Sequence, residues 1–402
     1  MPSATRPADR YSPLYLLAAL GAGGIAVTFF LWLMFWVPHP DRPVPVFEDI
    51  VAAFGAGDWR AQAMIGTAYL GIAFFAFQHY RLLIWNLMQL SRFKRTADYA
   101  ALCASNAESQ LMALPLTLAM AINVGFVLGM VAVPGLWGVV EWLFPGAVVA
   151  FLAVGVLALR QLGAFLGRVK TTGGFDWTGN GSFAQMLPAF ALSMVGVGLS
   201  APAAMSSVPL ISGASIILAT FFLVASAVVG IVALILGVHS MMSHGVSAEA
   251  APTILIVIPI LTVLGILMLR VGHGLHVHFG VHEAPGDMLL LLTKIVSAQV
   301  LFGIFGLAML RRTGYGVRFL SGPENSVGAY ALICPGVAMG VMLQFWINIG
   351  LVGAGLVAKF GVAFWVLSAL PVATQVWMVW LLLRLNRRHF ARPRVGQPVA
   401  AQ

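Results

Sequence analysis

Residues 208 to 238 read VPLISGASIILATFFLVASAVVGIVALILGV, a stretch without Asp, Glu, Lys or Arg. A bilayer core of about 30 Å is crossed by about 20 helical residues, so this stretch predicts a transmembrane helix. Nine further stretches meet the same criterion, and we therefore expect an all-α integral membrane protein. The ten predicted spans cover residues 12–37, 61–84, 109–133, 145–167, 184–206, 208–238, 252–271, 287–310, 328–352 and 361–384.

The composition of the chain agrees with a membrane protein. Of its 402 residues, 60% are hydrophobic and 9% are charged, which excludes a soluble globular enzyme. The net charge of +9 does not indicate nucleic-acid binding, because the basic residues lie at the ends of apolar runs and not in a patch. Cys103 and Cys334 are too few and too far apart for a disulfide framework or a Cys-x-x-Cys site.

The distribution of Lys and Arg predicts the topology. With the N-terminus inside, 17 of the 22 basic residues fall on the inner side, and the other five are Arg42, Arg60, Arg270, Lys294 and Lys359. Cytoplasmic loops of membrane proteins are enriched in Lys and Arg. We therefore expect one polytopic domain over residues 1–402 in the cell inner membrane, with cytoplasmic tails at 1–11 and 385–402.

Prolines recur at a regular interval in the odd-numbered spans. Pro115, Pro188, Pro259 and Pro335 are 73, 71 and 76 residues apart, which is the length of one helical hairpin. The first span has no central proline and carries glycines, among them Gly23 and Gly24, which permit a bend or a close helix contact. The pattern predicts five tandem hairpins whose bent odd-numbered helices surround a central path, with Asn106, Asn180 and Asn325 as N-caps. The alternative is that Pro and Gly are simply commoner in membrane helices, as Pro371 in the tenth span illustrates.

Fixed charge is scarce inside the predicted spans. None of the 13 acidic residues falls at mid-membrane depth, which disfavours a carboxylate-driven proton or cation pump. A small anion or a neutral solute suits such a path better. Lys294 in the eighth span is either an attractor for anions or a side chain that snorkels or pairs with Asp287, and Asn123 either lines the path or joins helices.

Several segments resemble TsoY-type membrane proteins and selenoproteins, and this likeness runs through most of the chain. The segments are Tyr11-Ser12-Pro13-Leu14-Tyr15-Leu16, Leu20-Gly21-Ala22-Gly23-Gly24, Phe35-Trp36-Val37-Pro38-His39-Pro40 and Ser105-Asn106-Ala107-Glu108. The architecture of ten spans with proline-bent odd helices is similar, more distantly, to the tellurite-resistance and dicarboxylate transporter family, which includes the plant slow-type anion channels.

The second resemblance implies a pore inside five odd helices, a trimeric assembly, and a phenylalanine gate just before the proline of the ninth span. This chain departs from that pattern, because Cys334 stands before Pro335. Phe345, about three turns further along, is an alternative gate residue. A thiol beside a helix break is also where redox chemistry would be sought in a selenoprotein-like family, although buried cysteine is usually inert.

Four histidines gather near the predicted outer end of the seventh span, namely His273, His276, His278 and His282. Imidazole is a frequent ligand of Zn, Cu and Ni, so they form a candidate metal site, a periplasmic pH sensor or a solvent-exposed loop. No nucleotide-binding or hydrolase motif is present, so no catalytic residue or cofactor is predicted. We expect a channel or secondary transporter for small anions or neutral solutes. The alternative is a membrane-embedded redox or metal-handling protein that uses Cys334 and these histidines.

Overall fold

The computed structural model describes residues 6–40, 42–173, 175–177, 181–282 and 284–391, and these residues form helices and connecting segments without a β-strand. Ten of the helices are long and apolar enough to cross a membrane, so the expected class of all-α membrane protein is confirmed at this level. The ten spans are Pro13–Trp36, Trp59–Phe93, Asn106–Ala132, Leu136–Thr171, Ala184–Met205, Pro209–His244, Ala251–Phe279, Pro285–Arg312, Val327–Val352 and Val362–Phe390.

The even-numbered spans form the longer continuous helices. They are α3 (Trp59–Phe93), α6 (Val140–Thr172), α9 (Pro209–His244), α11 (Pro285–Arg312) and α13 (Val362–Phe390). Several run well past the apolar stretch of the sequence, and α3 extends to Phe93 although the predicted span ends at residue 84. Two short helices, α2 (Phe47–Ala56) and α4 (Ala97–Cys103), lie in the predicted connectors.

Each odd-numbered span is built from two kinds of helix. A 3₁₀ segment comes first and an α-helix follows: η2 (Pro13–Tyr15) with α1 (Leu16–Trp36), η3 (Asn106–Met112) with α5 (Ala113–Ala132), η5 (Ala184–Met186) with α7 (Leu187–Leu199), η6 (Ala251–Ile256) with α10 (Val257–Phe279), and η8 (Val327–Leu332) with α12 (Ile333–Phe345). The fifth span is interrupted at Ser200 and continues as α8 (Ala201–Met205), and the ninth ends in the π-helix η9 (Trp346–Val352).

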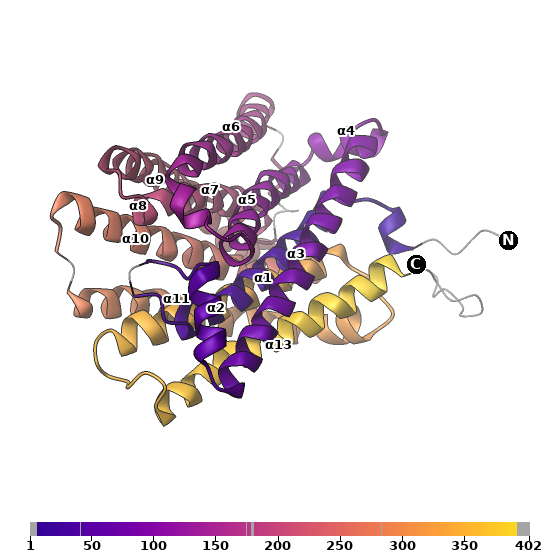
Figure 1. Ribbon diagram of the computed structural model, residues 1–402. Coiled ribbons are helices and arrows are strands. Elements are labelled where there is room, and N and C mark those ends of the chain that lie inside the picture. Colours follow the sequence, from indigo (N-terminus) through magenta and orange to yellow (C-terminus); the bar gives the residue numbers. More distant parts are fainter. Residues whose placement is uncertain (1–5, 41, 174, 178–180, 283, 392–402) are drawn as a thin grey trace.

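The odd-numbered spans are the interior helices of the bundle (Figure 1). Between 50% and 94% of their most apolar window is buried, against 11% to 33% for the even-numbered spans. Along the chain, α1, α5, α7, α10 and α12 each contact the next, and α12 contacts α1. Each of them also contacts a longer outer helix, namely α3, α6, α9, α11 and α13 respectively. The five inner helices therefore contact one another in a closed order, and the outer helices separate them from the surroundings.

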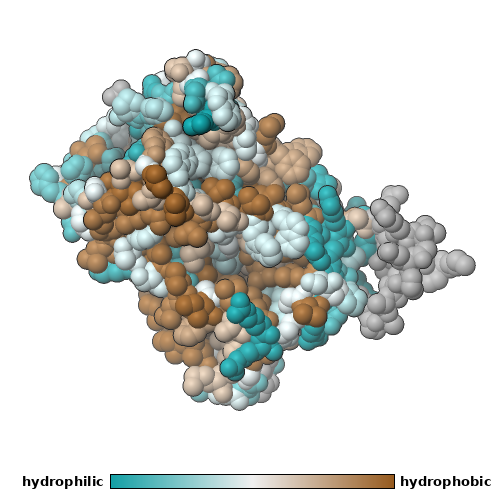
Figure 2. Space-filling view, turned by 90° about the horizontal axis from the view of Figure 1, so that it is seen from below, coloured by the Kyte–Doolittle hydropathy of each residue, from teal (hydrophilic) through white to brown (hydrophobic). Residues whose placement is uncertain are grey.

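The outer surface has the character expected for a lipid environment. Apolar residues occupy much of the middle of the face in Figure 2, and hydrophilic residues gather beside the end that carries the termini and in smaller patches elsewhere. Large exposed side chains on the outer helices include Leu210, Ile217, Trp142 and Leu301. At one end η1 (Pro7–Asp9) contacts α13, so the described ends of the chain lie on the same side of the bundle. An even number of spans requires this arrangement.

Candidate functional site

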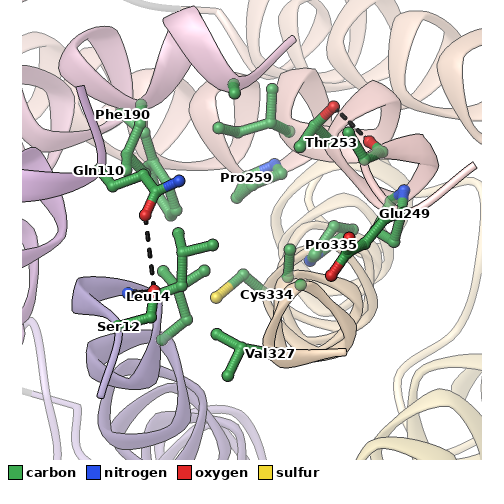
Figure 3. Close-up of a pocket in the computed structure, with 18 of the residues that line it drawn as sticks. Ser12, Leu14, Gln110, Phe190, Glu249, Thr253, Pro259, Val327, Cys334 and Pro335 are labelled. Atoms are coloured by element: carbon green, nitrogen blue, oxygen red, sulfur yellow. Dashed lines mark hydrogen bonds between the residues drawn. The ribbon is translucent and has the colours of Figure 1, made fainter. Parts of the chain in front are cut away.

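A cavity of about 430 Å³ lies where the five odd-numbered spans begin. Every one of these spans contributes to its wall, and residues of η2, η3, η5, η6 and η8 lie around it (Figure 3). The lining residues used below are Ser12, Leu14, Leu17, Gln110, Phe190, Glu249, Thr253, Pro259, Val327, Cys334 and Pro335. The cavity therefore lies at one end of the ring of inner helices, on the side that carries the chain termini.

Serine side chains support the 3₁₀ segments that form the wall. Ser12, Ser105 and Ser326 each accept a hydrogen bond from the backbone N–H two residues later, at 3.3, 3.2 and 3.1 Å. Ser182 accepts one from Ala184 N–H at 3.3 Å. A hydroxyl at this position satisfies a backbone donor that has no partner within the helix.

The predicted asparagine caps are therefore wrong where the structure describes them. Asn106 is the first residue of η3, after the Ser105 cap, and Asn325 precedes the Ser326 cap. Asn180 lies outside the described residues. The adjacent serine caps the helix instead of the asparagine. Its shorter side chain reaches the backbone N–H two residues on.

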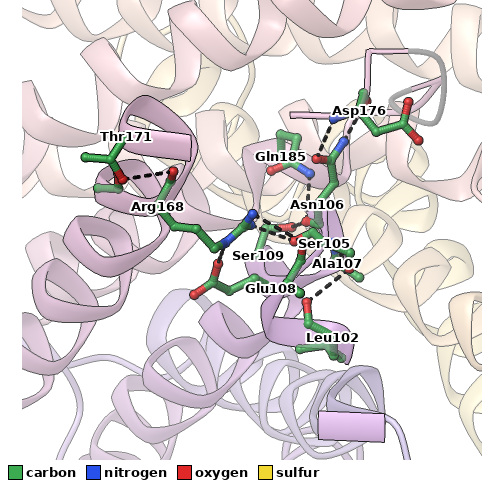
Figure 4. A network of polar contacts seen from close by, with 12 residues as sticks. Leu102, Ser105, Asn106, Ala107, Glu108, Ser109, Arg168, Thr171, Asp176 and Gln185 are labelled. Atoms are coloured by element: carbon green, nitrogen blue, oxygen red, sulfur yellow. Dashed lines mark hydrogen bonds and ion pairs between the residues drawn. The ribbon is translucent and has the colours of Figure 1, made fainter. Parts of the chain in front are cut away.

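Asn106 instead belongs to a polar network that joins three segments near the cavity (Figure 4). The Asn106 side-chain amide donates to the backbone carbonyl of Asp176 at 2.7 Å. The backbone carbonyl of Asn106 accepts a hydrogen bond from the Gln185 side chain at 3.0 Å. Arg168 of α6 pairs with Glu108 at 2.8 Å and also donates to the Ser105 carbonyl at 2.8 Å. These bonds hold the start of the third span against the neighbouring fourth and fifth spans.

The four recurring prolines lie at the junctions between the 3₁₀ and α segments. Pro188 is the second residue of α7, and Pro115, Pro259 and Pro335 are each the third residue of their α-helix. The first-turn donors of an α-helix have no intrahelical partner, so a proline there removes no α-helical hydrogen bond. The prolines thus mark the change of helix type near one end of each span, and Pro259 and Pro335 line the cavity.

The polar groups in the cavity wall are mostly uncharged. Ser12 Oγ donates to Gln110 Oε1 at 3.5 Å, and Thr253 Oγ1 donates to the Ala250 carbonyl at 2.6 Å. Glu249 is the only carboxylate among the described lining residues, and its Oε1 accepts a hydrogen bond from Ser326 Oγ at 3.0 Å. No Lys or Arg is among those lining residues. The cavity therefore offers neutral hydrogen-bonding groups and one negative charge at its rim.

Cys334 faces this cavity. Figure 3 shows its sulfur pointing away from α12 toward the Leu14 side chain. The thiol is half-buried and is not in a disulfide, and Cys103, the other free cysteine, lines a separate cavity of about 160 Å³. A solute in the cavity would therefore meet the Cys334 thiol directly.

On α1 and α7 the cavity lining ends at a large apolar side chain. The deepest lining residues include Leu17 of α1, Phe190 of α7 and Pro259 of α10. Phe190 is 4% exposed and its ring is the largest side chain at this level. Phe190 was not singled out in the sequence, because one phenylalanine among 26 gives no signal of its position.

Phe345, the gate residue proposed from the sequence, lies deeper in the bundle. It follows Cys334 by 11 residues, about three helical turns, and therefore projects from the same face of α12. Phe345 is 7% exposed, and its ring packs edge-on against Phe35 of α1 with centroids 5.3 Å apart. This pair is an aromatic contact between α1 and α12, on the side of the bundle away from the cavity.

The glycines of α1 serve close helix contact. A Cβ on Gly23 would lie 2.7 Å from Met120 Cγ and 2.8 Å from His79 Nδ1, and one on Gly24 would lie 2.9 Å from Val337 Cγ1. Their absent side chains let α1 approach α3, α5 and α12. Neither glycine is among the described lining residues of the cavity.

Asn123 lies at a contact between inner helices. Its Nδ2 donates to the Ala119 carbonyl of its own helix at 3.1 Å and lies 3.8 Å from Met194 Sδ on α7. Of the two alternatives left by the sequence, these contacts favour a role in joining α5 and α7.

Arg270 lies further from the end of its helix than the sequence predicts. We assigned it to the outer edge of the seventh span, but α10 continues to Phe279 and Arg270 is well inside this helix. Its guanidinium donates to the Val197 carbonyl of α7 at 2.9 Å. No carboxylate lies within ion-pair distance of it among the described residues. It follows Pro259 by 11 residues, so it projects from nearly the cavity-lining face of α10, about 16 Å further along.

Lys294 has the opposite environment. It is exposed on α11, the least buried of the ten spans, and is not among the described lining residues of the cavity. Its position on an outer helix favours the snorkelling alternative over a role in the central path. Hydropathy could not distinguish Lys294 from Arg270, because both follow or interrupt an apolar run.

The four histidines do not form a compact ligand set. His276 Nδ1 is 2.8 Å from the Val281 carbonyl, and His278 Nε2 is 2.9 Å from the Ser206 carbonyl. The rings of His276 and His282 have centroids 6.1 Å apart. Within the described residues no group of three or more His, Cys, Asp or Glu side chains is placed to hold a metal ion. His273 and His278 belong to α10, whose continuation past residue 271 spreads them around a helix.

Comparison with known proteins does not assign the chain to a family. Neither a scan against protein-family models nor a search of curated proteins found a match.

Proposed function

We propose that this chain is a multi-pass membrane channel or secondary transporter that passes small anions or neutral solutes between its inner helices. The observation that carries the proposal is the cavity of about 430 Å³ whose wall is formed by the beginnings of all five odd-numbered spans. Its volume falls in the usual range for small-molecule sites, about 300 to 1,000 Å³. A solute there would contact five helices at once, so small shifts between helices would open or close its route.

We further propose that five tandem hairpins, with bent odd-numbered helices, surround a path that continues from the cavity through the bundle. The closed order of contacts among α1, α5, α7, α10 and α12 supports this arrangement. The path would pass the Phe190 ring first and then reach the level of Arg270 and Phe345. Phe190 takes the role of inner constriction in this proposal, and the Phe35–Phe345 pair takes that of outer constriction.

Charges along this path favour an anion or a neutral solute. The Arg270 guanidinium donates one hydrogen bond to the described residues, to the Val197 carbonyl, and a guanidinium carries five N–H donors. An unpaired cation within a membrane bundle is by default a functional residue, and it would attract an anion and repel a cation. Glu249 at the mouth has the opposite effect, which keeps anion binding weak on that side. A neutral solute would be nearly indifferent to both groups.

The cavity would face the cytoplasm of a cell inner membrane. The support for this orientation is the charge distribution, in which 17 of the 22 basic residues fall on the side of the termini.

Flux through purified protein in liposomes tests the function. The panel should contain halide, nitrate, sulfite, a dicarboxylate and the neutral solute glycerol, with empty liposomes as the control for leakage. We expect at least one of these solutes to move faster in the protein-containing vesicles. If none moves above the leakage of empty liposomes, the proposal loses its support.

A redox or metal-handling function is the second candidate, and the direction of the Cys334 sulfur into the cavity favours it. It predicts a bound metal, a chromophore or a thiol of raised reactivity in purified protein. Elemental analysis, an absorption spectrum and a thiol titration check this. A colourless, metal-free and thiol-inert preparation excludes the second candidate and leaves the first untouched.

A further inference from the structure

A basic groove lies beside the C-terminal end of α13, outside the ring of inner helices. Its volume is about 590 Å³, and it is lined by Ser321, Gly322, Trp380, Leu383, Arg384, Arg387 and Arg388. Three arginines therefore occur within five residues, on neighbouring positions of one helix face. No carboxylate is among the described lining residues.

Two of the arginines are held in place by the protein. Arg388 donates four hydrogen bonds, all between 2.8 and 3.0 Å, to the carbonyls of Phe319, Leu320, Gly322 and Glu324. Arg384 donates through Nε to the Leu320 carbonyl at 3.1 Å, and its guanidinium lies 5.1 Å from the Trp380 ring centroid. These contacts fix both guanidinium groups without neutralising their charge.

Arg387 is exposed, and its side chain has no hydrogen bond or ion pair with a described residue. The nearest acidic side chain of the segment, Glu324, is already paired with Arg318 at 2.9 Å. The groove therefore carries three positive charges that no carboxylate of this segment compensates. Such a site is complementary to a phosphate group, which guanidinium binds with two parallel hydrogen bonds.

The position of the groove near the end of α13 favours a membrane lipid as the source of the phosphate. At about 1.5 Å per residue the 29 residues of α13 extend over about 43 Å, which exceeds the bilayer core of about 30 Å. The last turns therefore lie among lipid headgroups. Trp380 and Trp377 are 43% and 57% exposed, and exposed tryptophans are typical of the interface between headgroups and acyl chains. Trp380 and Leu383 thus lie on the same face of α13 as the arginines, toward the apolar part of the helix.

We propose that this groove is a binding site for the phosphate headgroup of an anionic phospholipid, with Arg384 and Arg387 on the phosphate and Trp380 and Leu383 against the glycerol and upper acyl chain. Arg388 contributes its positive charge from beside them, because its terminal N–H groups already donate to backbone carbonyls. Arg388 also holds residues 319 to 324, which lead into η8 at the cavity wall. A lipid in the groove would therefore stabilise this segment as well. Neither the lipid site nor its test depends on the solute that the cavity takes.

The test uses full-length, delipidated protein in detergent. Phosphatidylglycerol, phosphatidylcholine or inorganic phosphate is added, and bound lipid is counted by native mass spectrometry while the melting temperature is followed. We expect phosphatidylglycerol to bind and to raise the melting temperature more than phosphatidylcholine. Equal effects of the two lipids would overturn the proposal. A stabilisation by inorganic phosphate as large as that by phosphatidylglycerol would assign the groove to a soluble anion instead.

Arg387→Gln is the first variant, because the Arg387 side chain makes no hydrogen bond or ion pair with the described residues that its loss could disturb. An arginine near an anionic membrane surface contributes about fivefold to binding, so this variant should bind phosphatidylglycerol about fivefold more weakly. Arg384→Gln/Arg387→Gln should bind it about 25-fold more weakly, by the same factor applied twice. Arg160→Gln removes an exposed arginine from α6, outside the groove, and should bind as the unaltered protein does. Unchanged binding by a monodisperse double variant would refute the site.

Discussion

Replacing Arg270 with glutamine tests whether a half-buried guanidinium selects for anions. The substitution removes the charge but keeps a side-chain N–H₂ that can donate toward the Val197 carbonyl. That carbonyl also accepts a hydrogen bond from Ser200 Oγ at 2.8 Å, so it keeps a partner even if the glutamine does not reach it. The variant should therefore fold, and its melting temperature should stay close to that of the unaltered protein.

The expected magnitude follows from the bonds that an anion would lose. Hydrogen bonds to charged groups contribute about 1.5 to 3 kcal/mol each. Loss of one such bond between Arg270 and a passing anion weakens its binding about tenfold to a hundredfold. Anion flux below saturation should fall by at least about tenfold on this basis, whereas glycerol flux should change by less than about twofold.

The assay measures both solutes in the same batch of liposomes. Arg270→Lys serves as the charge-retaining variant and should keep most of the anion flux. Arg60→Gln serves as the matched control, because Arg60 is an exposed basic residue in the first turn of α3, outside the inner ring. It should leave both fluxes unchanged.

Two results would refute the reasoning. If Arg270→Gln lowers anion and glycerol flux by the same factor, the residue acts through packing and not through its charge. If a well-folded Arg270→Gln protein conducts anions as before, Arg270 does not face the path at all.

Four further predictions follow from the cavity and its surroundings. Glu249→Gln removes the negative charge at the mouth and should raise anion flux but not glycerol flux in the same liposomes. Phe190→Ala should raise basal flux through the inner constriction, and an unchanged basal flux would exclude Phe190 as a constriction. The same variant should lower the free energy of unfolding by about 3 to 5 kcal/mol, measured by denaturant titration in detergent. A charged, membrane-impermeant thiol reagent in the lumen of liposomes should block flux when the cavity faces the lumen, and Cys334→Ser should abolish this block. A block that remains in Cys334→Ser would assign the modified thiol to Cys103. The N–H of Gly135 donates to Glu48 and holds the pKa of this carboxyl below its ordinary value of 4.5, so the stabilisation by ionised Glu48 is present at neutral pH and is lost as pH falls through the lowered pKa. Glu48→Gln should therefore reduce the drop in melting temperature between pH 7 and the acid range. An unchanged drop would contradict this.

Much of the fold could be predicted from the sequence because lipid imposes a one-dimensional rule. Each span must be long and apolar enough to cross the bilayer, and this property can be measured along the chain without knowing any contact. All ten predicted spans correspond to long helices for this reason. Their ends were less certain, because helices such as α3 and α10 continue into polar residues that hydropathy counts as loop.

The recurring prolines show a partial success. Their spacing predicted special positions in the odd-numbered spans, and these positions exist at the junction of 3₁₀ and α helix. The sequence placed them inside the helices because a proline in a long apolar run has no visible helix start beside it. The serines beside the starts of four of these spans, three of them N-caps, were the missing signal.

The candidate site depended on which way each side chain faces around its helix. Arg270 and Lys294 have similar sequence surroundings, yet Arg270 donates to Val197 inside the bundle and Lys294 is exposed on an outer helix. Cys334 and Phe190 reach the cavity only because α12 and α7 meet the other inner helices with those faces. Hydropathy along the chain determines which segments enter the membrane. The direction of a side chain is decided by helix packing, because apolar helices are soluble in lipid on every face until close contact with a neighbour selects one.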